Sequence, residues 1–143
     1  MRVNFNEIED AFMFVNMGQA YEHLAYVSKE SGKIYYYSEY GDTLEELPDD
    51  IDDPICVAIP YSNELGLGRN LALEFTRKFM EQQAEYVESI FRKKGAYSRF
   101  KDLLEQVGEL DHWYRYEEEA QRTRLLEWCE DNEIPLSGNQ QKK

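Results

Sequence analysis

The sequence holds little cysteine, glycine or proline, and each shortage excludes a class of protein. Its 2 cysteines, Cys56 and Cys129, are too few and too far apart for the disulfide framework of a small secreted domain. Its 8 glycines and 4 prolines in 143 residues exclude a low-complexity or collagen-like chain. We therefore expect a globular protein whose two thiols stay reduced and buried.

Long apolar runs are also missing from the sequence. The first residues, MRVNFNEIED, lack the apolar stretch of a secretory signal. No apolar run approaches the roughly 20 residues that are needed to span a bilayer. We therefore expect a cytoplasmic protein that has no membrane partner.

Positive charge is scarce, because 16 lysines and arginines stand against 29 aspartates and glutamates, which gives a net charge of -13. Such a surface repels phosphate backbones, which argues against non-specific binding of nucleic acids or anionic membranes. The hydrophobic share of 42% is large enough to build a core. We predict a single α+β domain over residues 1–136 and a disordered polar tail over residues 137–143.

The first half of the chain changes from a helical period to a strand period. Asn4 can cap a helix, and the apolar residues after it recur at the helical period. Residues 20–28 and 33–38 alternate as the two strands of a hairpin. Residues 54–60, PICVAIP, are apolar on both faces, which predicts a central strand covered on both sides. The predicted helical core face consists of Phe5, Ile8, Ala11, Phe12 and Val15.

The second half of the chain has the pattern of a series of helices. Apolar stripes predict helices over residues 69–80 and 84–93, with a break near residues 80–83. Two further helices are predicted over residues 96–107 and 111–132. The fold class that follows is α+β, with a small three-stranded antiparallel sheet (a hairpin plus one apolar strand), about five helices and a helical C-terminal half.

One stretch reverses the charge of the chain. Residues 91–102, FRKKGAYSRFKD, hold five cations and one anion around Gly95. Glycine lets a chain turn sharply after a helix, so we predict a corner at Gly95 between two helices that face the core. The cations before Gly95 then meet the negative end of a helix dipole, and those after it lay their stems beside the core. This arrangement explains the charge without a ligand.

A functional explanation uses the same corner. A helix that begins at Ala96 has free backbone N–H groups, and helix N-termini attract anions. The surrounding lysines and arginines would strengthen this attraction, and Tyr97 could supply a stacking surface. A phosphorylated small molecule or an acidic protein segment would suit such a site. The candidate anion- or partner-binding residues are Arg92, Lys93, Lys94, Gly95, Tyr97, Arg99 and Lys101.

The same stretch resembles part of a bacterial protein family. GAYSRFKD at residues 95–102, then Trp113, then Trp128 before the pair 133–134, follow the order of motifs in the uncharacterised protein family 0158. The GAYSRFKD block is specific, and the wider pattern spans residues 20–135. That family has no known activity, so the resemblance implies a fold and a cytosolic bacterial origin but no mechanism.

Two positions depart from the pattern of that family. Cys129 stands where a leucine is usual, and Asn132 and Glu133 stand where an Asn-Gly pair is expected. Both departures lie at the end of the last predicted helix.

No motif in the sequence assigns a catalytic residue, a cofactor or a metal. His23 and His112 lack the spacing of a zinc site, and no nucleophile elbow or phosphate-binding glycine loop occurs. The aspartates of residues 49–53 lack the glycine and the closing glutamate of a calcium-binding loop. Glu117 and Arg124 lie on the expected buried face of the last helix, where charged pairs are usually structural.

Three functions follow from these features. The sequence favours a non-enzymatic binding or adaptor module that uses residues 92–101 to hold an anionic ligand or an acidic partner. An RNA-binding protein that uses the same patch is one alternative, although the acidic remainder of the chain counts against it. An enzyme whose site is assembled from scattered residues, without a motif, is the other alternative.

Overall fold

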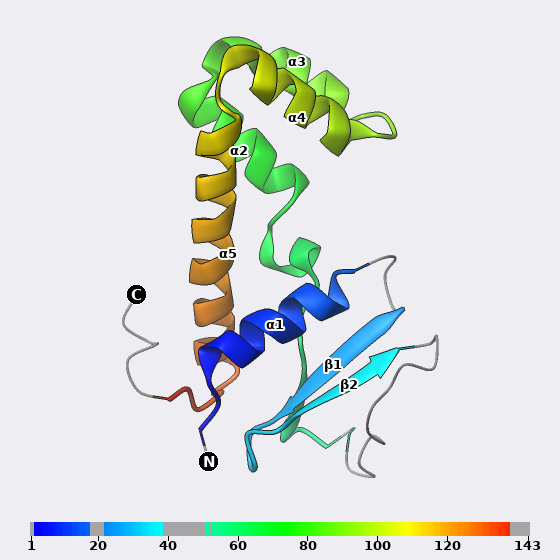
Figure 1. Ribbon diagram of the computed structural model, residues 1–143, viewed down its shortest axis with the longest axis vertical. Helices are drawn as coiled ribbons and strands as arrows, with labels where there is room; N and C mark the ends of the chain where they lie inside the picture. Colours follow the sequence, from blue (N-terminus) through cyan, green and yellow to red (C-terminus); the bar gives the residue numbers. More distant parts are fainter. Residues whose placement is uncertain (1, 18–21, 39–50, 52, 138–143) are drawn as a thin grey trace. The chain divides into compact units, whose positions relative to one another are not determined.

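The computed structural model describes residues 2–17, 22–38, 51 and 53–137 of the chain. Along this part of the chain one helix is followed by three strands and then by four helices, with two short 3-10 helices between them (Figure 1). The predicted α+β class with a helical C-terminal half is therefore confirmed. Two compact units divide the chain: unit 1 is residues 1–65 with 122–143, and unit 2 is residues 66–121.

The domain prediction is not settled by this division. The two units are parts of one chain, and helix α5 contributes residues to both of them. The single domain over residues 1–136 therefore stays a prediction. Of the predicted tail over residues 137–143, only Ser137 lies among the described residues.

Helix α1 (Phe5–Val15) opens unit 1 where the sequence predicts it. The side-chain oxygen of Asn4 accepts a hydrogen bond of 2.8 Å from the backbone N–H two residues later, which caps the helix. All five predicted core residues of the helix are buried. The ring of Phe14 meets the rings of His23 and Tyr36 edge-on, with centroids 4.9 and 5.0 Å away. These contacts fix α1 against one face of the sheet.

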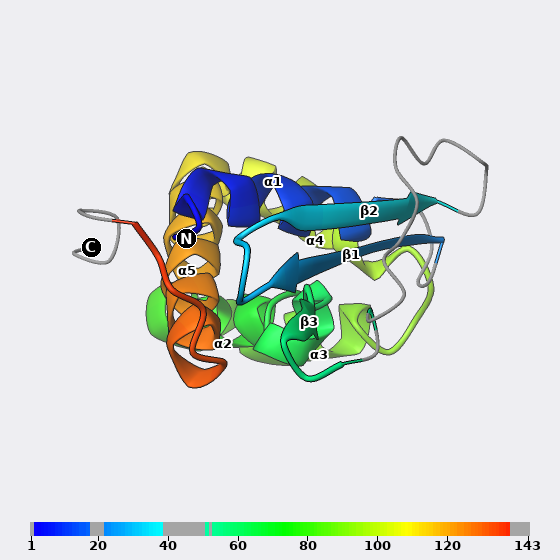
Figure 2. The same ribbon diagram turned by 90° about the horizontal axis from the view of Figure 1, so that it is seen from below.

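The sheet of unit 1 has three antiparallel strands among the described residues. Strands β1 (His23–Ser28), β2 (Ile34–Ser38) and β3 (Cys56–Ala58) stand in the order β2-β1-β3 (Figure 2). The predicted hairpin of β1 and β2 is confirmed. Ala25 and Val27, which share the β1 face that carries His23, are buried.

The prediction that residues 54–60 form a central strand is wrong for the described sheet. Strand β3 has 3 residues and lies at the edge, and β1 is the central strand. Pairing extends by one residue at each end: the N–H of Ile59 donates to the Ala25 carbonyl at 2.9 Å, and the N–H of Lys29 donates to the Ile55 carbonyl at 2.7 Å. Pro54 and Pro60 have no N–H to offer a second neighbour, and proline confines a strand to a sheet edge. Apolar residues on both faces of this segment therefore did not indicate whether the strand lies at the centre or at the edge of the sheet.

The two ends of the described chain meet in unit 1. Helix α5 (Leu110–Asp131) ends there, and the segment after it pairs in parallel with the N-terminal segment. The N–H of Val3 donates to the Pro135 carbonyl at 2.7 Å, and the N–H of Ser137 donates to the Val3 carbonyl at 2.9 Å. This pairing holds the C-terminal segment beside the end of α5.

The sequence predicts two buried thiols, and only one of them is fully buried. Cys129 of α5 has no exposed surface, whereas Cys56 of β3 is half-buried. Burial raises the pKa of the Cys129 thiol to about 12, because the apolar surroundings disfavour the thiolate. Cys129 is therefore a packed apolar side chain rather than a reactive nucleophile.

Unit 2 consists of helices in the part of the chain that is described. Helix α2 (Arg69–Phe79), a 3-10 turn (Glu81–Gln83), α3 (Ala84–Ile90) and α4 (Ala96–Val107) precede the first part of α5. The 3-10 turn confirms the predicted break near residues 80–83. Among the helices of the described residues, none has both the length and the apolar character to cross a bilayer.

The centre of unit 2 is aromatic. The Trp113 side chain of α5 has no exposed surface, and its ring lies 5.3 Å from that of Phe75 and 5.1 Å from that of Phe100. Phe79, which the sequence predicts on the buried stripe of α2, is instead 46% exposed at the edge of this cluster. It still contacts His112, with ring centroids 4.4 Å apart. Helices α2, α4 and α5 are thus joined through one group of rings.

Candidate anion-binding site

The corner predicted at Gly95 is present in unit 2. Helix α3 ends at Ile90, and Gly95 takes the left-handed conformation, with φ 72° and ψ 20°, directly before α4 begins. A Cβ atom at Gly95 would meet nothing within 4 Å, so the backbone angle and not crowding calls for glycine. Figure 1 shows α3 and α4 joined by this short loop. We call residues 92–101 the basic joint.

Phe100 anchors the joint to the core. Its side chain has no exposed surface, and its ring lies 5.6 Å from that of Phe91 and 5.1 Å from that of Trp113. Phe91 belongs to the loop and Trp113 belongs to α5, so Phe100 fixes the start of α4 against both. The predicted core face of α4 is confirmed at Phe100, and Val107 at the far end of the helix is 42% exposed.

Four cations of the joint are exposed. Arg92, Lys93 and Lys94 lie in the loop, and Arg99 lies in the first turn of α4. Among the described residues, no carboxylate forms an ion pair with any of the four. Their charge is therefore open to solvent and to an anionic ligand.

The fifth cation of the joint is engaged within unit 2. The ammonium group of Lys101 lies 4.9 Å from the ring centroid of Tyr97 and 5.4 Å from that of Tyr114. Aromatic faces attract cations, and Lys101 is half-buried between the two rings. Lys101 therefore has a structural contact that the other four cations lack.

Tyr97 packs inward instead of offering an open ring. It is half-buried, and its hydroxyl group donates a hydrogen bond to the carboxylate of Glu117 on α5. Burial, followed by this hydrogen bond and the charge of Glu117, raises the pKa of Tyr97 above its usual value of 10.0. The hydroxyl group thus stays protonated and remains a donor at neutral pH. Lys101 over its ring and Glu117 at its hydroxyl group thus hold Tyr97 within unit 2.

The first turn of α4 begins without a side-chain cap. The first helical hydrogen bond runs from the Arg99 N–H to the Gly95 carbonyl at 3.2 Å. No side chain caps the helix and no acidic residue lies in its first turn. The N–H groups of Ala96, Tyr97 and Ser98 precede this first helical bond, and no side chain of the described residues caps them. A phosphate or a carboxylate could accept their hydrogen bonds while the nearby cations balance its charge.

The partners of Glu117 and Arg124 could not be read from the sequence. Glu117 accepts from Tyr97, which is 20 residues away, and Arg124 donates to the Leu65 carbonyl at 3.1 Å in unit 1. Their place on a mainly buried face was predictable from the helical period. Their partners depend on how the helices pack, which no local pattern records.

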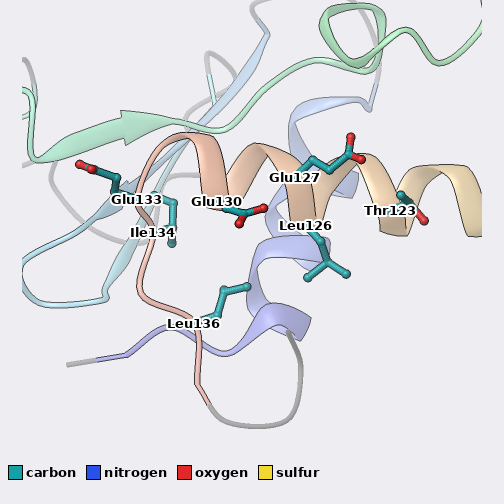
Figure 3. Close-up of a pocket in the computed structure, with 7 residues that line it drawn as sticks. All are labelled: Thr123, Leu126, Glu127, Glu130, Glu133, Ile134 and Leu136. Atoms are coloured by element: carbon teal, nitrogen blue, oxygen red, sulfur yellow. The ribbon is translucent and has the colours of Figure 1, made fainter. Parts of the chain in front are cut away.

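A groove of about 570 Å³ in unit 1 was not predicted from the sequence (Figure 3). It lies between the end of α5 and the segment that follows. The spacing of the glutamates on α5 was a readable signal, but the opposite wall depends on the pairing of the C-terminal segment with Val3. The residues that line the groove include Leu126, Glu127, Glu130, Glu133, Ile134 and Leu136.

Comparison with known proteins supports the resemblance seen in the sequence. A model of the family described as "Uncharacterised protein family (UPF0158)" matches residues 3–142. The Pseudomonas aeruginosa protein named "UPF0158 protein PA5073" is 30% identical over 119 residues, which make up 80% of this chain and 76% of that relative. No solved structure gives a significant match. The resemblance predicted from the GAYSRFKD block is confirmed, and the match extends beyond residues 20–135.

Proposed function

Because the chain belongs to the uncharacterised protein family UPF0158, whose description states no activity, we propose a function from the site itself. The protein is a non-enzymatic binding module of the bacterial cytoplasm. Its basic joint holds the anionic group of a ligand or of an acidic protein segment. The supporting observation is the start of α4, which has no side-chain cap, beside exposed cations that have no ion-pair partner in the described part of the chain.

The charge of the whole chain supports a local and oriented interaction. With a net charge of -13, most of the surface repels an approaching anion, and the joint is a local exception. An anion that reaches the joint meets both cationic side chains and N–H groups at a helix start, and these favour the same pose. Binding at the joint should therefore depend strongly on salt, because exposed charges are screened beyond about 10 Å at 0.1 M.

The chemistry of the joint suits a phosphate or a carboxylate displayed on a larger molecule. Arg92 and Arg99 can each bind such a group through two parallel hydrogen bonds, which a lysine cannot do. Both arginines are exposed, so a group on a protein surface could reach them. This access favours an acidic segment or a phosphorylated side chain as the ligand.

The RNA-binding alternative has less support. Binding of single-stranded RNA combines a positive groove with aromatic rings that stack on bases. Tyr97, the aromatic residue expected to stack, is half-buried and carries Lys101 over its ring. The observations therefore favour an anion site over a surface that holds bases.

The test compares two double variants of the full chain. Arg92→Ala with Arg99→Ala removes the cations of the joint, and Arg69→Ala with Arg115→Ala removes two exposed arginines elsewhere in unit 2. The probes are a fluorescent peptide of glutamates and a peptide that contains phosphoserine, each titrated at about 50 and 300 mM salt.

We expect the joint variant, which lacks two charges, to bind a probe about 2- to 30-fold more weakly than the intact chain, at about 0.2–1 kcal/mol for each exposed charge. The matched variant should retain its affinity. Equal affinity of the joint variant and the intact chain would overturn the proposal. So would an equal loss in the matched variant, because only net charge would then matter.

A further inference from the structure

The groove of unit 1 combines an apolar floor with an acidic rim. Ile134 is 4% exposed and Leu136 is 3% exposed, and Leu126 is half-buried. Figure 3 shows Leu126 and Leu136 directed toward one another from α5 and from the segment after it. Glu127, Glu130 and Glu133, all exposed, also line the groove. We call this surface the acidic groove.

Two carboxylates of the groove, those of Glu127 and Glu130, destabilise the helix that carries them. Helix α5 has no basic residue in its last turn, where cations would interact favourably with the negative end of the helix dipole. Glu127 and Glu130 instead bring negative charge to that end. Local helix energetics therefore do not explain the choice of these residues.

The backbone at Glu133 is also unfavourable for its residue type. Glu133 has φ 58°, which makes it a non-glycine residue in the left-handed region. The N–H of Ile134 donates to the Cys129 carbonyl at 2.8 Å, which is the helix-ending pattern that usually places glycine at the position of Glu133. A glycine there would remove strain, so Glu133 occupies this position at a local cost in stability.

Nothing in the described part of the chain neutralises the rim. No lysine or arginine of the described residues forms an ion pair with Glu127, Glu130 or Glu133. Three carboxylates without cationic partners create a negative potential over an apolar floor. The complement of such a surface is a positive charge on an aliphatic stem.

We propose that the acidic groove binds a basic segment of a partner protein, in which arginines or lysines flank aliphatic residues. An aliphatic side chain of the partner would cover Leu126 and Leu136, while the methylene stems of its cations follow the floor and their heads reach the glutamates. This proposal is independent of the basic joint, which lies in unit 2 and attracts the opposite charge.

A single metal ion fits the groove less well than a segment. Glu127 and Glu130 lie on α5, whereas Glu133 lies beyond its end, so the three carboxylates come from two different segments. Oxygen ligands lie within about 2.6 Å of a calcium ion. Among the described residues no three acidic, histidine or cysteine side chains cluster in a way that could hold a metal. An extended chain with several cations matches the spread of the carboxylates.

The test uses three capped hexapeptides as probes on the full chain. One alternates arginine and leucine, one alternates arginine and serine, and one alternates glutamate and leucine. The variant Glu127→Gln with Glu130→Gln removes charge from the rim, and Glu118→Gln with Glu119→Gln removes the same charge from exposed positions elsewhere on α5. Affinities are measured by isothermal titration at about 50 mM salt, where screening is weak.

We expect the arginine–leucine peptide to bind best and the glutamate–leucine peptide not to bind. The rim variant should bind the first peptide 2- to 10-fold more weakly than the intact chain, whereas the matched variant should lose less than 2-fold. The variant Glu133→Gly should weaken binding while it raises the melting temperature, because it removes both the charge and the strain. A misfolded variant cannot produce that combination.

Three results would overturn the proposal. The first is equal binding of the arginine–leucine peptide to the rim variant and the intact chain. The second is equal binding of the arginine–serine peptide, which would show that the apolar floor contributes nothing. The third is a dimer of the intact chain that the rim variant breaks, which would make a second copy the occupant of the groove.

Discussion

The basic joint and the acidic groove differ in how far local stability explains their residues. In the joint, Gly95 suits its left-handed backbone, and cations after α3 meet the negative end of that helix. In the groove, Glu133 strains the backbone and Glu130 opposes the dipole of α5. Residues that stability does not explain are stronger indications of function. The strained and destabilising residues of the groove therefore support a functional role for it. The support for a functional role of the joint is the start of α4, which has no side-chain cap.

The largest expected effect is a loss of stability when a buried side chain that supports one of the two surfaces is truncated. Phe100→Ala should lower the free energy of unfolding by about 3–5 kcal/mol, because it leaves a cavity beside Trp113 and Phe91. Ile134→Val, which removes one methyl group from the groove floor, should cost only about 0.5–1.5 kcal/mol. Urea denaturation measures both. A loss below 1 kcal/mol for Phe100→Ala would mean that the ring does not anchor the joint.

High pH should affect the two units differently, since each contains a group whose pKa is raised, Cys129 in unit 1 and Tyr97 in unit 2. The Cys129 thiol has a pKa of about 12, against about 8.5 in an unfolded chain. Between these values the unfolded chain releases the proton and the folded chain keeps it, so stability falls as pH rises. The loss should reach about 3 kcal/mol by pH 10.5, and Cys129→Ala should remove this slope.

Tyr97 should contribute at still higher pH. Its pKa is raised by burial and by Glu117, so its share of the loss begins only above pH 10. Tyr97→Phe should flatten that later part of the curve and leave the earlier part unchanged. Denaturant unfolding at a series of pH values checks both variants. If the free energy of unfolding of Cys129→Ala fell with pH between 9 and 10 as steeply as that of the intact chain, the loss could not be assigned to the Cys129 thiol.

The two left-handed turns should respond to substitution with opposite signs. Gly95→Ala should destabilise the protein by about 1 kcal/mol, because alanine is strained at φ 72°. Glu133→Gly should stabilise it by a similar amount, because glycine accepts φ 58° without cost. Thermal unfolding of both variants beside the intact chain gives the signs directly. If both variants shifted the melting temperature in the same direction, the backbone at Glu133 would not be strained in the way that distinguishes the groove from the joint.

Charge reversal should give the smallest effects. Glu130→Lys places a cation at the negative end of α5 and should add about 0.3–1 kcal/mol of stability. Lys93→Glu places an anion just after α3 and should subtract a few tenths of a kcal/mol. Both shifts should shrink in about 1 M salt, where charges are screened within 3 Å. Salt-independent shifts would point to packing instead of charge.

The sequence predicted the features that depend on neighbouring residues. The cap at Asn4, the corner at Gly95 and the buried face of Phe100 each follow from one residue type and its close spacing. The end of α4 at Gly108 is of the same kind, since that residue has φ 78°. Local backbone preference and the helical period are sufficient for such predictions.

Features that depend on distant segments were missed or misplaced. Strand β3 reads as a buried strand, but its edge position depends on which strands pair with β1. The ring of Tyr97 turns inward because Glu117 and Lys101 are present to meet it. The acidic groove exists only because the C-terminal segment returns to pair with Val3. None of these partners can be identified from the spacing of residues alone.

The most direct test of the joint as an anion site is a titration of the isotope-labelled full chain with the phosphoserine peptide, followed by amide NMR. The account predicts saturable shifts at Ala96, Tyr97 and Ser98, which begin α4 beside the exposed cations. The amides of Asn70 and Leu71 at the start of α2 are the internal control, because that helix also lacks a side-chain cap. Equal shifts at the two helix starts, or none at Ala96 to Ser98, would contradict the account.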